Sequence, residues 1–201
     1  MKTFWARVQR WLRFNLFYLG NPPWDTGVSP PELKAFLEKA QPGRALDVGC
    51  GTGTNLLTMA EAGWQVVGID IAWLSILRAK NKVQQDDLEA RVIYGDITGE
   101  PDIHPPFDLI LDIGCYHGLS QKGREDYRAH IRDWLNPGGT LLMYAHRQIS
   151  EEQSHGITEN DLDAFESFLK LQWRDDGDEV RPDGGGGYPA TWVRFDRAKE
   201  A

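Results

Sequence analysis

The glycine-rich segment that follows Val48 constrains the fold of this chain more than any other part of its 201 residues. An apolar, strand-like run ends at Val48, and a helical pattern resumes at Leu56 after the glycines at 49, 51 and 53. A glycine-rich turn between a parallel strand and a helix lets backbone N–H groups and the helix N-terminus approach a ligand. The alternative is an ordinary tight turn, which the acidic residues Asp47 and Asp70 argue against.

Asp70 ends a second apolar run, Val66–Ile69, and lies seventeen residues after Gly53. A carboxylate at the tip of the second parallel strand is placed to accept hydrogen bonds from both hydroxyls of a ribose. The dinucleotide fingerprint requires a third glycine where this chain has Thr54. Asp47 would repel a pyrophosphate but suits a sulfonium ligand with an amino-acid tail. The pattern therefore favours an adenosine ligand that carries positive charge over a nicotinamide dinucleotide.

Strand-like and helix-like segments alternate along most of the chain. This order predicts an α/β fold with a doubly wound, mostly parallel sheet. The last two strands border an acidic, glycine-rich tip and predict a C-terminal antiparallel hairpin, with Trp173 and Trp192 in the core. The expected strands are 44–48, 65–69, 90–94, 107–113, 140–145, 171–174 and 191–195, and the expected helices are 1–20, 30–39, 54–62, 74–85, 125–135 and 159–170, with a turn at 136–139.

Four stretches occur in the order typical of class I S-adenosylmethionine-dependent methyltransferases, which the chain resembles from about residue 20 to 195. The resemblance implies S-adenosylmethionine as cofactor and a seven-stranded, Rossmann-like sheet whose seventh strand is antiparallel. It also implies cofactor contacts at each strand end. The residues concerned are Asp47, Gly49, Cys50, Gly51 and Asn55 for the methionine part, Asp70 and Ile71 for the ribose, Asp96 and Ile97 for the adenine, and Asp112 and Ile113 facing the methyl group.

Two of these residues, Asp96 and Asp112, and the nearby His117 also have a purely structural interpretation. Asp96 can cap the turn 95–99 through its own side chain, as Asp often does. Asp112 can form the local turn after its strand. His117 can be a histidine whose hydrogen bonds are satisfied at a helix end.

Two segments indicate a narrower group. Pro23-Trp24-Asp25-Thr26-Gly27 and the phrase from Asp112 to Leu119 resemble small-molecule methyltransferases of the thiopurine, halide/thiol and tellurite-resistance types. That resemblance implies that Trp24 folds over the cofactor and that the acceptor is a small molecule, such as a thiol or another soft nucleophile. An oxygen or nitrogen acceptor would need a base, for which Tyr116 or His117 is the candidate. A non-catalytic S-adenosylmethionine-binding module is the alternative from another class.

Residues 1–24 are expected to form an amphipathic helical segment attached to a single methyltransferase domain, 25–201. Arginines line one side of the helix and apolar residues the other. We expect the helix to pack on its own domain as a lid over the cofactor; the alternative is contact with a membrane surface. The apolar side contains Phe4, Trp5, Val8, Trp11, Leu12 and Leu16, and the basic side contains Arg7, Arg10 and Arg13.

Composition limits the partners and the compartment. The net charge of −8 argues against a nucleic-acid partner, which would require a basic face. Two cysteines make no disulfide framework and indicate a reducing, cytoplasmic compartment. The five histidines show no metal-ligand spacing, no run is long enough to span a membrane, and arginines interrupt any secretory signal.

Overall fold

The computed structural model describes residues 2–86, 88–150, 153, 155–179 and 187–199, with side chains from Val8 onward. The chain forms two compact units. Unit 1 consists of Met1–Pro42 and Gly49–Asp102, and unit 2 consists of Gly43–Val48 and Ile103–Ala201. The chain therefore passes from one unit to the other three times.

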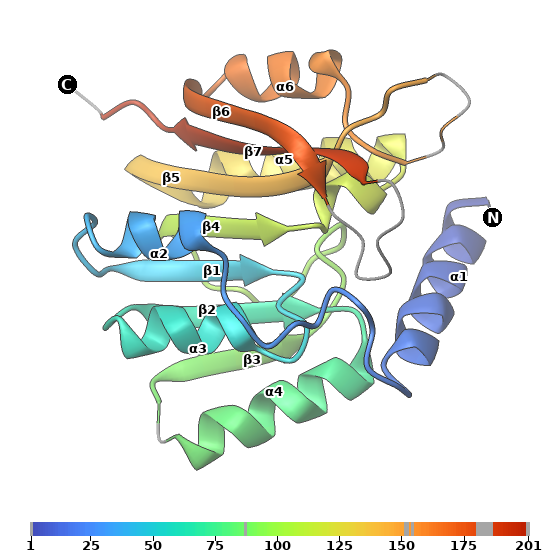
Figure 1. Ribbon diagram of the computed structural model, residues 1–201, viewed down its shortest axis with the longest axis vertical. Helices are drawn as coiled ribbons and strands as arrows, with labels where there is room; N and C mark the ends of the chain where they lie inside the picture. Colours follow the sequence, from blue (N-terminus) through green and yellow to red (C-terminus); the bar gives the residue numbers. More distant parts are fainter. Residues whose placement is uncertain (1, 87, 151–152, 154, 180–186, 200–201) are drawn as a thin grey trace. The chain divides into compact units, whose positions relative to one another are not determined.

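Unit 2 is built on β4, which is fully buried at Leu109, Ile110 and Leu111 because both neighbouring strands and the packed layers cover it. β4 pairs in parallel with β1 and β5, so the chain leaves all three strands at the same edge. β7 lies antiparallel between β5 and β6, and α6 packs beside β6 (Figure 1). The elements are β1 (Arg44–Val48), β4 (Phe107–Ile113), η1 (Tyr116–Gly118), α5 (Gln121–Trp134), β5 (Leu135–His146), α6 (Glu159–Glu166), β6 (Lys170–Glu179) and β7 (Tyr188–Asp196).

Unit 1 contains the parallel pair β2 and β3, which is packed against α3 and α4. Leu56 and Met59 of α3 and Ile76 of α4 are completely buried, so the helical periodicity of these segments reflects a core face. The elements are α1 (Lys2–Phe17), α2 (Pro31–Leu37), α3 (Thr54–Glu61), β2 (Gln65–Asp70), α4 (Trp73–Gln85) and β3 (Ala90–Tyr94).

The seven strands follow the order β3-β2-β1-β4-β5-β7-β6. The pairs β2–β3, β1–β4 and β4–β5 are parallel, and the two pairs made by β7 are antiparallel. The predicted fold class is confirmed: a mostly parallel α/β sheet with a C-terminal antiparallel hairpin. Strands 44–48, 90–94 and 107–113 have the predicted bounds, and 65–69 extends by one residue to Asp70.

The structure differs from the sequence prediction at several boundaries. α5 begins at Gln121 instead of residue 125, because the Ser120 hydroxyl caps it by accepting from Gly123 N at 3.2 Å. β5 runs through the predicted turn 136–139, where the β4–β5 register shifts and Gly138 adopts φ 80°. The hairpin strands are longer than predicted and extend to Glu179 and from Tyr188.

The placement of Trp173 in the core is wrong. Its side chain is 36% exposed on β6, while Trp192 on β7 is half-buried. β6 is an edge strand of the sheet. An edge strand packs on fewer neighbours, so a tryptophan there stays partly in solvent.

Candidate functional site

The glycine-rich loop of unit 1 needs its glycines for backbone geometry. Gly49, Gly51 and Gly53 adopt φ of 73°, 54° and 86°, a region that side chains disfavour. The loop is joined to β2 by hydrogen bonds from the N–H groups of Gly49 and Cys50 to Ile69 O, at 2.8 and 3.0 Å. At Gly53 a Cβ would also lie 3.1 Å from the Cβ of Ala79. Residues 49–53 therefore form a fixed, side-chain-poor cradle before α3.

Asp70 joins this loop to the carboxyl end of β2. One carboxylate oxygen accepts from Gly51 N at 2.9 Å and the other from Ala72 N at 2.7 Å. The Ser75 hydroxyl and the Ile71 N–H are further donors to this carboxylate. Burial raises the pKa of Asp70, and the backbone donors counteract that increase. Ile71 follows at the strand end and is half-buried.

Asn55 and Asp47 flank the loop in sequence. Asn55 lies in the first turn of α3, and no described residue bonds its buried Oδ1 atom. Asp47 belongs to unit 2, where it is 2% exposed on β1. The methionine and ribose parts of S-adenosylmethionine require polar atoms and bare backbone. The buried Asn55 Oδ1, the glycine cradle and the Asp70 carboxylate provide these features, so the residues fit this cofactor.

Asp96 has two structural partners in unit 1. Its side chain caps the turn by accepting from Thr98 N at 3.0 Å and from Thr98 Oγ1 at 2.8 Å, which is the interpretation left open from the sequence. The same oxygen accepts from the Arg10 guanidinium at 2.5 Å. Burial raises the pKa of Asp96, but Arg10 and Thr98 outweigh it and leave the pKa below its ordinary value. Ile97 beside it is buried.

Helix α1 lies across the carboxyl-end edge of β2 and β3 (Figure 1). Besides the Arg10–Asp96 ion pair, Trp11 Nε1 donates to Tyr94 Oη at 2.7 Å and Trp73 N donates to Asn15 Oδ1 at 2.9 Å. The contacts are therefore largely polar.

Only part of the apolar stripe of α1 is docked over its described part: Trp11 contacts Tyr94 and Val8 is half-buried, but the two leucines of the stripe are exposed. Leu12 and Leu16 are 47% and 64% exposed. The side chains of Phe4 and Trp5, which were assigned to the same stripe, lie outside the described residues.

Tyr18 and Trp24 lie at the glycine-rich loop. A Cβ on Gly51 would lie 2.9 Å from the Tyr18 hydroxyl, and Trp24 Nε1 donates to that hydroxyl at 3.2 Å. Burial and the nearby Asp70 carboxylate raise the pKa of Tyr18. Trp24 packs edge-on against Phe17 and stays 46% exposed. The segment after α1 thus folds back to the loop expected to hold the cofactor.

In unit 2, Asp112 ends β4 and organises the loop that follows. It is fully buried, and its carboxylate accepts from Cys115 N at 2.8 Å and Tyr116 N at 3.1 Å. Burial raises the pKa of Asp112 to about 7. Asp112 is therefore a turn former, the alternative that the sequence left open, while Ile113 beside it is half-buried.

Tyr116 is fully buried, and its hydroxyl is engaged. The hydroxyl donates to Asp161 Oδ1 at 3.1 Å and accepts from the Arg128 guanidinium. Burial and the Asp161 charge raise the pKa of Tyr116 above its ordinary value. This environment holds the phenol protonated and inside the packed unit.

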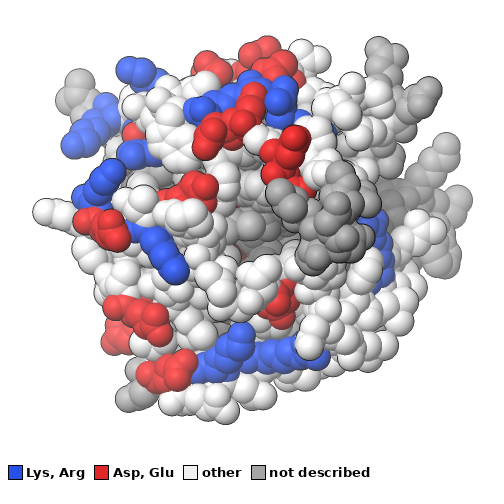
Figure 2. All heavy atoms as spheres, viewed as in Figure 1, with Lys and Arg blue, Asp and Glu red and all other residues white. Residues whose placement is uncertain are grey.

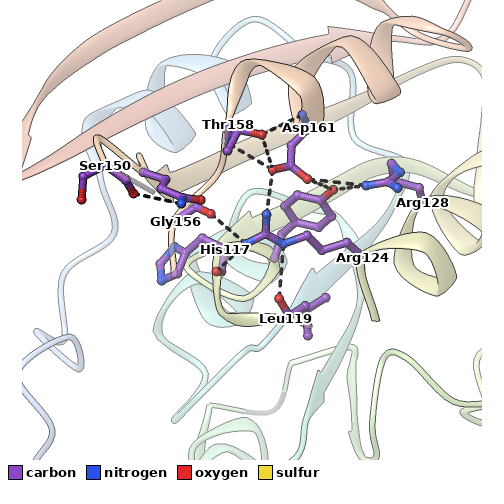
Figure 3. A network of polar contacts seen from close by, with 10 residues as sticks. His117, Leu119, Arg124, Arg128, Ser150, Gly156, Thr158 and Asp161 are labelled. Atoms are coloured by element: carbon purple, nitrogen blue, oxygen red, sulfur yellow. Dashed lines mark hydrogen bonds and ion pairs between the residues drawn. The ribbon is translucent and has the colours of Figure 1, made fainter. Parts of the chain in front are cut away.

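Arg124 joins three segments of unit 2 around Asp161 (Figure 3). Its guanidinium donates to Asp161 Oδ2 at 2.7 Å and to the backbone oxygens of His117 and Gly156 at 3.0 and 2.7 Å. Asp161 also closes the capping box of α6 with Thr158. The network holds the loop after β4, the loop after β5 and the start of α6 in one arrangement.

His117 is held by its ring and by its backbone. Ring atom Nδ1 accepts from His146 N at 3.1 Å, which assigns the proton of the neutral ring to Nε2. Burial, with His146 and His155 nearby, lowers the pKa of His117 to about 3. His117 is therefore neutral at physiological pH and has a donor at Nε2.

The structure brings the predicted residues together in two groups. Gly49, Cys50, Gly51, Asn55, Asp70, Ile71, Asp96, Ile97 and Trp24 belong to unit 1, and Asp47, Asp112, Ile113, Tyr116 and His117 belong to unit 2. The sequence analysis missed Arg10, Tyr18, Arg124, Asp161, His146 and Glu179. Only Asp161 had a local signal, the Thr-x-x-Asp pattern of a capping box; the others act through long-range contacts.

Residues 45–139 match the family described as a methyltransferase domain. The chain is 28% identical over 112 residues to ribosomal RNA small subunit methyltransferase C of Alcanivorax borkumensis, covering 54% of this chain and 34% of that protein. It is 30% identical over 124 residues to the 2-heptyl-1-hydroxyquinolin-4(1H)-one methyltransferase of Mycobacteroides abscessus, covering 61% and 55% respectively. The matches thus span only about a third to a half of these two relatives.

A solved structure supports the fold over nearly the whole chain. The N-methyltransferase NodS from Bradyrhizobium japonicum, in complex with S-adenosyl-L-homocysteine, superposes with a TM-score of 0.76 at 19% identity and covers 95% of this chain and 98% of that one. The order of strands, the strand-end motifs and these matches agree. Residues 45–139, which match this domain, lie in a Rossmann-like methyltransferase fold, and the methyltransferases of this fold use S-adenosylmethionine as cofactor.

Proposed function

We propose that this protein is an enzyme that transfers the methyl group of S-adenosylmethionine to a small-molecule acceptor. The observation that carries the proposal is the Asp70 carboxylate bonded to Gly51 N at the glycine-rich loop. That arrangement presents a carboxylate and a bare backbone side by side, which suits a ribose and an amino-acid tail. The cofactor supplies a methyl group already activated by its sulfonium, so the protein mainly aligns the reactants and excludes water.

In this proposal each predicted site residue is assigned to one part of the cofactor. Gly49, Cys50, Gly51 and Asn55 hold the methionine part, and Asp47 balances its positive charge. Asp70 and Ile71 hold the ribose. Asp96 and Ile97 hold the adenine, while Asp112 and Ile113 form the strand end that faces the methyl group.

Helix α1 is proposed to cover the adenosine part as a lid. Its support is the Arg10–Asp96 ion pair, because Asp96 is the carboxylate assigned to the adenine. The side chains of this pair are only 19% and 10% exposed, so the contact excludes water from the strand end. We further propose that Trp24, beside Tyr18 at Gly51, closes the methionine end, and that residues 25–201 act as one domain to which this lid is attached.

The acceptor is proposed to be small rather than a nucleic acid. Figure 2 shows basic and acidic side chains interspersed with uncharged surface on the face drawn, instead of one basic field. The thiopurine, halide/thiol and tellurite-resistance types remain the proposed subtype, with a thiol or other soft nucleophile as one acceptor class. The other acceptor class that we propose is a hydroxyl group, and the relative from Mycobacteroides abscessus is named for a substrate that carries one.

The proposed compartment is the cytoplasm, since both cysteines, Cys50 and Cys115, are thiols. Within the described residues, no helix has the length and apolarity needed to cross a bilayer.

Calorimetry with S-adenosylmethionine, S-adenosylhomocysteine and NAD tests the cofactor, and a screen of thiols, phenols and amines with labelled cofactor tests the transfer. We expect both sulfur ligands to bind, NAD not to bind, and S-adenosylhomocysteine to accumulate only with an acceptor. Binding of NAD alone would refute the cofactor assignment. Cofactor binding without transfer to any acceptor would favour the non-catalytic binding module.

A further inference from the structure

Three aromatic rings of unit 2 stack at the carboxyl end of β5. The rings of His117 and His146 lie 4.4 Å apart at 10°, and those of His146 and Tyr188 lie 5.4 Å apart at 20°. The His146 ring is thus stacked with two nearly parallel rings, which leaves the ring nitrogens in its plane available for hydrogen bonds. Among the described residues no three His, Cys, Asp or Glu side chains are arranged to hold a metal ion, so the group is not a metal centre.

Glu179 fixes the tautomer of His146. The carboxylate lies 2.6 Å from His146 Nε2 and accepts from Tyr144 Oη at 2.6 Å. Burial raises the pKa of Glu179, but the bonds from Tyr144 and His146 outweigh it and leave the pKa below its ordinary value. An ionised carboxylate only accepts hydrogen bonds, so the His146 proton is on Nε2 and the lone pair is on Nδ1.

The two stacked histidines therefore have opposite hydrogen-bonding roles. His117 has its Nδ1 lone pair occupied by a backbone N–H and presents a donor. No hydrogen bond joins His146 Nδ1 to a described residue, and 22% of the side chain is exposed, so the ring is partly open to solvent. A histidine with one nitrogen on a carboxylate and the other nitrogen open is the arrangement of a general base.

We infer that His146, oriented by Glu179, is the base that takes the proton from an aromatic hydroxyl on the methyl acceptor. The location supports this role. His146 is the last residue of β5, whose Tyr144 pairs with Ile113 at the end of β4, the strand end assigned to the methyl group. The neighbouring rings of Tyr188 and His117 suit a planar acceptor. This inference rests on the proposed methyl transfer.

The chemistry distinguishes a hydroxyl from the other acceptors. A thiol has a pKa of about 8.5 and ionises without much help, and a neutral amine attacks through its own lone pair. A phenol with a pKa of about 10 stays protonated near neutral pH and gains most from a base.

In the proposed step the hydroxyl proton moves to His146 Nδ1, and an electron pair of the phenol oxygen forms the bond to the methyl carbon. The carbon–sulfur bond breaks with its electrons on sulfur, which becomes neutral, and the imidazolium faces Glu179 until water removes the proton.

The test compares His146→Asn and Glu179→Gln with His130→Asn, a control histidine that stacks on Trp134 of α5. Each protein is assayed with two phenols, one protonated and one already ionised at the assay pH. We expect His146→Asn to lower kcat for the protonated phenol by about 100-fold or more and Glu179→Gln by less. The ionised phenol should be methylated by His146→Asn at close to the wild-type rate, and the control should match wild type on both.

A second readout does not depend on turnover. The ¹⁵N shifts of the imidazole should show His146 with its proton on Nε2 in the wild type and a mixture of tautomers in Glu179→Gln. Equal losses of His146→Asn on both phenols, no loss on either, or a proton on Nδ1 would overturn the inference. A wild-type protein that binds cofactor and methylates thiols but no phenol would overturn it while the proposed function stands. Absence of cofactor binding would overturn both.

Discussion

Replacing Asp70 by Asn removes the negative charge of the carboxylate that is proposed to bind the ribose, while it keeps the size of the side chain. In the structure each Asp70 oxygen already accepts one backbone N–H, from Gly51 and from Ala72. The amide has one oxygen only, so its NH₂ group must face one of those N–H donors. The variant therefore perturbs both the ligand and the loop.

The size of the effect follows from the number of charged hydrogen bonds. A hydrogen bond to a charged group contributes about 1.5–3 kcal/mol. Loss of one such bond to the ribose weakens binding about 10-fold to 150-fold. The unpaired loop donor costs roughly 1–3 kcal/mol of folding free energy, which lowers Tm by a few degrees for a chain of this length.

Calorimetry with S-adenosylhomocysteine measures the first effect, and thermal unfolding without ligand measures the second. The matched control is Asp102→Asn, whose carboxylate is 71% exposed and pairs with Arg91 in the same unit. The control should leave both quantities near wild type. If Asp70→Asn binds the cofactor as tightly as wild type, the ribose does not contact this carboxylate and the reasoning fails.

Three further outcomes are expected. Arg10→Ala should speed cofactor release in stopped-flow measurements. The control is Arg13→Ala, whose guanidinium lies over the rings of Phe14 and Phe17 and which should not change the release rate. Equal release rates for the two variants would contradict the proposal that α1 is a lid. Deletion of residues 1–24 should abolish turnover, and its effect on Tm should be much smaller. Full activity of the truncated protein together with loss of binding to vesicles would support the membrane alternative. Asp112 has a folded-state pKa near 7, above its unfolded value, so it stabilises the fold at acidic pH and this contribution is lost as pH rises through about 7. Unfolding from pH 5 to 8 should therefore show a steeper loss of stability in wild type than in Asp112→Asn, and parallel curves would contradict the buried carboxylate.

The sequence alone determined the fold class and the bounds of most strands, because both follow from local patterns. Apolar runs without breaks predicted the buried parallel strands, and β4 occupies the predicted residues 107–113. The turn that contains the glycines at 49, 51 and 53 could also be predicted, since the ability to adopt a positive φ is a property of the single residue. Asp70 was predicted at a strand end because it ends the apolar run Val66–Ile69, and it is the last residue of β2.

The tertiary structure decided which side chains meet across long stretches of chain. Arg10 reaches Asp96, Arg124 reaches Asp161, and His146 reaches Glu179, over separations of 86, 37 and 33 residues. No local pattern encodes such pairs, because they arise only when the sheet brings strand ends and loops together. The docked face of α1 is another case. Periodicity identified its apolar stripe, but the contacts with β2 and β3 are largely polar.

The chemistry assigned to the histidines changed for the same reason. From the sequence, His117 and Tyr116 were the candidate bases because they follow the fourth strand. The structure buries the Tyr116 hydroxyl against Asp161 and occupies the free lone pair of His117 with a backbone N–H from β5. A side chain's role as donor or acceptor depends on what its other atoms bind, and those partners are set by tertiary packing rather than by neighbours in the chain.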